Sequence, residues 1–177
     1  MKKRVGSLIL IILLFMMAGS AFADEDIKAH PTCVYCGMDR QQFAHSRMII
    51  EYEDGTVVPF CSIHCAAVDL ALKIEKTPKS IMVGDYATKE LIDAEKAYWV
   101  LGGAKMGVMT KRAKWAFATK NRAERFISGN AGTLIRFDDA LKASYADMNT
   151  DTVMIRNKKK MMRMKQMKSE GMLQHAH

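Results

Sequence analysis

The sequence has little of what most enzymes and most nucleic-acid-binding proteins need. Its 177 residues show no Ser–His–Asp set, no paired carboxylates and no glycine-rich phosphate loop, so we do not expect an enzyme. The net charge of +8 does not indicate nucleic-acid binding either, because it comes from the two ends of the chain. Residues 24–150 contain equal numbers of acidic and basic side chains. The sequence therefore argues against DNA or RNA as a partner.

Long apolar runs are scarce, and the longest lies at the start of the chain. Residues 2–4 are basic, residues 8–17 are apolar, and Ala21-Phe22-Ala23 forms a small-x-small cleavage site. This pattern predicts a signal peptide at 1–23 that is removed on export, which places the rest of the chain in the periplasm. The run is short for a membrane-spanning helix, so an uncleaved, anchored form is the weaker alternative. No cysteine lies near the cleavage site, so we do not expect a lipoprotein signal.

Apolar periodicity and turn signals divide the following residues into two similar halves. The first half predicts strands at 47–53 and 56–60 around the hairpin signal Asp54-Gly55, then a helix at 62–73 and a strand at 81–86. The second half predicts strands at 97–101 and 114–119, a helix at 121–128 and a strand at 133–137, before a last helix at 138–146. The predicted fold class is α+β, with two ββαβ-like halves and mainly antiparallel sheet. We expect one domain at 24–148.

The four cysteines of the chain form two close-spaced pairs, Cys33 with Cys36 and Cys61 with Cys65. Such spacing is typical of a metal site. Three interpretations remain open from the spacing: zinc held by all four thiolates, two disulfides in an oxidising compartment, or copper(I) bound by soft sulfur donors. His64 lies between the second pair and is a further candidate ligand.

Methionines shift the balance toward copper(I). Met38 follows the first cysteine pair, and a thioether is a poor ligand for zinc but a good one for copper(I). A basic tail at 149–177 holds five methionines between residues 161 and 172 and ends in His175 and His177. It has no aromatic residue and little to bury, so we expect it to be flexible or loosely helical. Two roles stay open for it, collection of copper or peripheral contact with a membrane or partner.

The segment Cys33-Val34-Tyr35-Cys36-Gly37-Met38 closely resembles the leading motif of NosL proteins. Weaker segments follow in the family's order: Phe60-Cys61-Ser62-Ile63-His64-Cys65, Tyr98-Trp99-Val100, Met106-Gly107-Val108-Met109 and Trp115-Ala116-Phe117. The resemblance implies an extracytoplasmic copper(I) chaperone with two ββαβ-like halves. It also implies Cys36 and Met38 as copper ligands, joined by Met109. The plain signal and the Met-rich tail depart from the common family pattern.

The resulting hypothesis is a periplasmic metallochaperone that binds copper(I) and delivers it to a copper enzyme. Through the resemblance, the expected partners are nitrous oxide reductase and its assembly machinery. The candidate metal-site residues are Cys36, Met38, Met109, Cys33, Cys61, Cys65 and His64. The alternative is a TRASH-like binding module stabilised by zinc or disulfides, with zinc at the four cysteines and no copper transfer.

Overall fold

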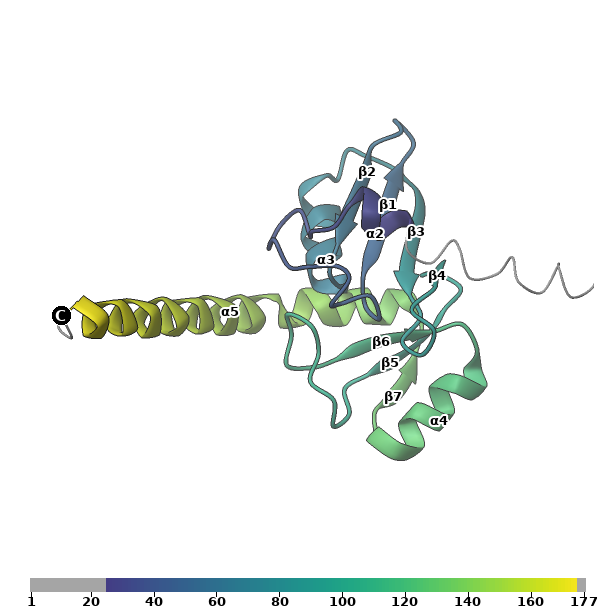
Figure 1. Cartoon of the computed structure of the whole chain (residues 1–177). Coiled ribbons are helices and arrows are strands. Elements are labelled where there is room, and N and C mark those ends of the chain that lie inside the picture. The colour runs from purple at the N-terminus through teal and green to yellow at the C-terminus, as the bar shows by residue number, and fades with distance from the viewer. Residues whose placement is uncertain (1–24, 175–177) are drawn as a thin grey trace, which may run out of the picture.

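The computed structural model describes residues 25–174, with side chains through residue 168. The predicted signal peptide at 1–23 and the histidines at 175 and 177 lie outside these residues. The described part is an α+β fold with two antiparallel sheets, which confirms the predicted class (Figure 1).

The first half forms a four-stranded sheet covered by one helix. Its elements are β1 (Met48–Tyr52), β2 (Val57–Phe60), α3 (Ile63–Leu72), β3 (Pro78–Gly84) and β4 (Leu91–Asp93), and the strand order is β2-β1-β3-β4. Along β1 the buried side chains alternate with half-buried ones, because successive residues of a strand point to opposite faces. Gly55 turns the β1–β2 hairpin with φ of +82°, a conformation that glycine adopts without steric cost.

The second half repeats the order of the first. It contains β5 (Tyr98–Leu101), β6 (Lys114–Phe117), α4 (Lys120–Asn130) and β7 (Thr133–Ile135), and its strand order is β6-β5-β7. The two ββαβ units thus place corresponding strands in corresponding positions, as the sequence predicts. Helix α4 begins slightly earlier than expected, because the Thr119 side chain accepts a hydrogen bond from the Arg122 N–H and caps it.

The two halves share one hydrophobic core and are joined by a buried acid. The carboxylate of Asp85 accepts hydrogen bonds from the backbone N–H groups of Ala87 and Thr88 at 2.8 Å and of Ala118 at 2.7 Å. The Tyr86 N–H also donates to the Ala116 carbonyl, which lies in β6. These contacts fix the second sheet relative to the first.

Two elements were not predicted from the sequence. One is β4 at the sheet edge, and the other is α2 (Glu25–Ala29), which precedes the first predicted strand. Helix α2 is held by Asp26, whose carboxylate pairs with Arg40 and Arg47. Both arginines are fully buried, so this short helix closes a charged network inside the first half.

The last helix, α5 (Phe137–Gln174), is far longer than the nine residues predicted for it. Its first turns pack against α3 and β5, and its later part projects away from both sheets (Figure 1). The segment expected to be flexible or loosely helical from residue 149 is therefore helical through Gln174. The domain boundary at 148 stays a prediction. Within the described part of the chain, no helix is both long enough and apolar enough to cross a membrane.

Candidate metal centre

The four cysteines meet at one point of the first half. Cys33 and Cys36 lie in the segment between α2 and β1, Cys61 follows β2, and Cys65 is in the first turn of α3. Their sulfur atoms all lie within 4.8 Å of one another, and all four are free thiols. The Cys36 and Cys61 sulfurs are 3.5 Å apart, and those of Cys61 and Cys65 are 3.8 Å apart. Tetrahedral metal–sulfur bonds of about 2.3 Å require sulfur atoms about 3.8 Å apart, so the cluster fits one four-coordinate ion.

A tight turn places the first cysteine pair. The Cys33 N–H donates to the Met38 carbonyl, and the Gly37 N–H donates to the Cys33 carbonyl, both at 2.9 Å. Gly37 has φ of +72°, so this position requires the conformational freedom of glycine. The Val34 N–H bonds to the Pro59 carbonyl at 3.1 Å and attaches the turn to β2, immediately before Cys61. These bonds shape the turn that holds the first cysteine pair and place it beside the second pair.

The thiols differ in their access to solvent. Cys33, Cys61 and Cys65 are buried, whereas Cys36 is partly exposed. Hydrogen bonds to Cys36, Cys61 and Cys65 lower the pKa of Cys33. The pKa of Cys36 is lowered to about 7, since its bond to Cys33 raises it while bonds to Cys61 and Cys65 lower it.

The pKa values of Cys61 and Cys65 are raised, because both donate to the more acidic thiols and both are buried. The four thiols interact closely, so they titrate together as one cluster. A cation that binds all four sulfurs must therefore displace the protons of Cys61 and Cys65.

A cavity of about 490 Å³ opens beside Cys36. Five methionines from three parts of the chain line it: Met38, Met106, Met109, Met154 and Met162. The structure therefore brings Cys36, Met38 and Met109 together at one cavity, although Met109 belongs to the second half. Their role as ligands stays a prediction.

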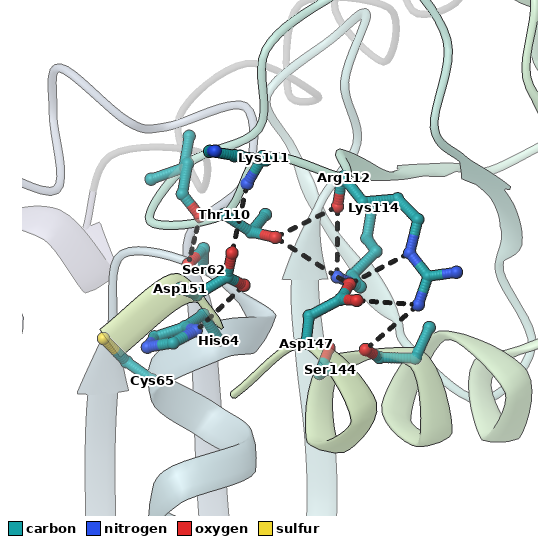
Figure 2. Close-up of polar contacts among 12 residues, drawn as sticks. Ser62, His64, Cys65, Thr110, Lys111, Arg112, Lys114, Ser144, Asp147 and Asp151 are labelled. Carbon is teal, nitrogen blue, oxygen red and sulfur yellow. Dashed lines mark hydrogen bonds and ion pairs between the residues drawn. The ribbon is translucent and has the colours of Figure 1, made fainter. Parts of the chain in front are cut away.

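The loop between β5 and β6 carries Met109 to this cavity in a constrained conformation. Met109 itself has φ of +62°, which is uncommon for a residue other than glycine. The Ser62 hydroxyl, at the start of α3, donates to the Val108 carbonyl at 3.2 Å (Figure 2). A Cβ atom added to Gly107 would lie 2.5 Å from a Thr110 methyl group, so the loop folds closely on itself. These contacts attach the Met109 loop to the helix that carries Cys65.

The sequence model of the NosL family matches residues 24–145. The chain belongs to the NosL family. The crystal structure of the copper chaperone NosL from Shewanella denitrificans is similar, with a TM-score of 0.51 and 26% sequence identity over 63% of this chain and 90% of that chain. The HTH-type transcriptional repressor CutR of Bacillus subtilis is 30% identical over 115 residues, which are 65% of this chain and 59% of that protein. This chain thus spans less than two thirds of the length of CutR.

Membership of the NosL family and the structural likeness agree with the prediction that the chain is not an enzyme. The family match ends at residue 145, within α5. The later turns of this helix nevertheless border the metal centre, because Met154 and Met162 line the cavity beside Cys36. The sequence indicated the tail methionines, Met162 among them, as a group that could collect copper, but it did not place Met106, Met154 or Met162 at this cavity.

Two histidines lie near the centre in different surroundings. His45 lines the methionine cavity and packs against Trp115 and Tyr86, with ring centroids 5.4 and 5.7 Å away. His64 lines a smaller cavity of about 220 Å³ together with Cys36, Cys65 and Met109. Burial is the main cause that lowers the pKa of each. Both imidazoles are therefore neutral near pH 7.

His64 faces a buried carboxylate on α5, outside the range of the family match. Its Nδ1 lies 3.7 Å from Asp151 Oδ2, and Asp151 Oδ1 accepts a hydrogen bond from the Lys111 N–H at 3.2 Å (Figure 2). A second acid on the same helix, Asp147, pairs with Arg112 at 2.9 Å and Lys114 at 2.7 Å. These acids attach α5 to the loop that carries Met109. His64 Nδ1 is directed to Asp151, outside the four-sulfur cluster.

Proposed function

We propose that this NosL-family protein is a copper(I) chaperone whose transferable ion is bound by Cys36, Met38 and Met109. The observation that carries this proposal is the single cavity at which these three residues, from two halves of the fold, meet. Thiolate and thioether sulfurs are the donors that copper(I) prefers. The similar fold of a copper chaperone supports a chaperone role with copper.

Charge balance also favours a monovalent soft ion. The cavity has no carboxylate among its lining residues, and it has two ammonium groups, those of Lys158 and Lys159. One thiolate and two neutral thioethers around copper(I) carry no net charge, so the complex tolerates partial burial. A divalent ion bound by the same three donors would keep a positive charge beside two lysines.

The position of Cys36 suits transfer of the ion. It is the exposed member of the thiol cluster and borders the cavity, so an incoming protein ligand can approach the ion from the open side. A thioether is a weak ligand that is replaced readily, and the thiolate holds the ion until the acceptor's donors have bound. Copper(I) then passes by ligand exchange, with no change of oxidation state.

The location and acceptor belong to this proposal as well. The predicted signal peptide supports export to the periplasm. Membership of the NosL family supports delivery of copper for the maturation of nitrous oxide reductase. Contact between the later part of α5 and an anionic membrane surface is compatible with the seven basic and no acidic residues at 152–168.

A second candidate follows from the geometry of the thiols. Four sulfurs within 4.8 Å, three of them buried, fit a closed structural zinc site. In that case the protein is a zinc-stabilised binding module without copper transfer. The two candidates compete for Cys36, because this sulfur belongs to both donor sets.

The decisive experiment is an anaerobic copper(I) titration of residues 24–177 against bicinchoninate, with zinc content measured in parallel. We expect tight binding in the wild type and its loss in the double variant Cys36→Ser/Met38→Leu. Met82→Leu, a strand residue away from the cavity, is the matched control and should bind as the wild type does. Co-purified zinc together with unchanged copper(I) affinity in the double variant would refute the chaperone proposal.

A further inference from the structure

The cavity beside Cys36 holds more thioethers than the proposed copper site uses. Beyond Met38 and Met109, it is lined by Met106 from the β5–β6 loop and by Met154 and Met162 from α5. Met106 is 78% exposed and Met162 is 53% exposed, so burial in a core does not explain them. Leucine would cover a partly buried wall equally well, whereas only methionine adds a soft donor atom.

The two methionines on α5 that line the cavity are spaced so that their sulfur donors extend outward from Cys36. Met154 and Met162 are eight residues apart, which is about 12 Å along a helix. Both nevertheless line the same cavity, so they lie along its length and do not converge on one point. Met154 is half-buried and Met162 is more exposed, which makes a path from solvent toward the thiolate.

The chemistry of this outer part selects a soft monovalent ion and binds it weakly. All three donors are neutral, so copper(I) bound by them keeps its positive charge beside Lys158 and Lys159, which line the same cavity and weaken its binding. No carboxylate is present to hold a hard cation such as magnesium or calcium. Thioethers alone hold copper(I) less firmly than a thiolate does, so an ion here can move on to Cys36.

We propose that Met106, Met154 and Met162 form an entry subsite that receives copper(I) and passes it to the inner site. The inference rests on the proposed function, because it assigns Cys36, Met38 and Met109 as the destination. Each step exchanges one sulfur ligand for the next while copper stays in the +1 state. Helix α5 thereby lines the way to the inner site with weaker thioether donors beyond the range of the family match.

The first test measures the rate of uptake. Copper(I) is supplied as its bicinchoninate complex to residues 24–177 in an anaerobic stopped-flow instrument. We expect Met154→Leu/Met162→Leu to slow uptake about fivefold, with the affinity at equilibrium unchanged within about twofold. Met161→Leu/Met164→Leu is the control, since these residues lie on the same helix, are about as exposed as Met162 and do not line the cavity. Equal rates for the two double variants would overturn the proposal.

The second test detects the subsite directly with silver(I), a redox-inert soft ion, and 13C-methyl-labelled methionine. In Cys36→Ser/Met38→Leu, which lacks the inner site, we expect silver(I) to shift the methyl signals of Met154 and Met162 and to leave Met161 unchanged. Absence of those shifts would overturn the entry subsite. Failure of the proposed function looks different, because the same variant would then keep the wild-type copper(I) affinity.

Discussion

Removal of the Asp26 carboxylate should destabilise the first half strongly, because it is the acid of a buried charge network. Asp26 accepts hydrogen bonds from Arg40 Nη2 at 2.8 Å, Arg47 Nε at 2.9 Å and Arg47 Nη2 at 2.8 Å. Both guanidinium groups are fully buried. Arg40 also donates through Nε to the Phe60 carbonyl, next to Cys61, so the network supports the metal centre.

The expected loss for Asp26→Ala is about 3 kcal/mol. Removal of one partner of a buried ion pair typically costs about 3–5 kcal/mol. The lower end applies here because both arginines keep carbonyl acceptors, His30 for Arg40 at 2.6 Å and Ala44 for Arg47 at 2.8 Å. With a urea m-value of about 2 kcal/mol/M, the unfolding midpoint should fall by about 1.5 M.

Urea unfolding of residues 24–177, followed by far-UV circular dichroism, measures this loss. The control is Glu51→Ala, which breaks the exposed ion pair of Glu51 with Lys79 and should change stability by about 0.5 kcal/mol or less. A loss below about 1 kcal/mol for Asp26→Ala would refute the assignment of Asp26 as the acid that compensates the two buried arginines.

The same network predicts a pH dependence. Burial raises the pKa of Asp26, but the hydrogen bonds and charges of Arg47 and Arg40 lower it below the ordinary value of 3.8. Because the carboxylate is the stabilising form, its contribution is complete above about pH 4 and is lost as pH falls through the lowered pKa. Urea midpoints between pH 2 and 7 should therefore fall less steeply at the acid end in Asp26→Asn than in the wild type.

Three further predictions concern the metal centre and its supports. Gly37→Ala should lower the free energy of unfolding by about 1–2 kcal/mol in urea melts, because φ of +72° is strained for alanine although its Cβ meets no neighbour. Cys65→Ser should abolish zinc retention, measured by elemental analysis, while its copper(I) affinity, measured against bicinchoninate, stays near wild type. An equal loss of both metals would show one shared site. Asp151→Ala should cost about 1–3 kcal/mol, since the partly buried Lys111 N–H loses its acceptor and His64 loses its neighbour. Faster hydrogen exchange in α5 would show the loosened contact.

Sequence alone was sufficient for the features that depend on local preferences. The alternation of β1, the Asp54-Gly55 turn and the helical spacing of α3 each reflect backbone geometry within a few residues. The order of these signals predicted the two ββαβ units. The motif around Cys36 and Met38 carried the family resemblance. Its turn also depends on local preferences, because hydrogen bonds between neighbouring residues and the positive φ of Gly37 close it.

The tertiary structure decided which distant residues share a site. Cys36 is at once a member of the four-thiol cluster and a wall of the methionine cavity, because β2 and α3 bring the second cysteine pair to the first. Met109 and Met154 reach that cavity through the packing of the second half and of α5, and Asp26 reaches two arginines by the folding back of α2. Such contacts join residues far apart in the chain, and periodicity within a short segment holds no information about them.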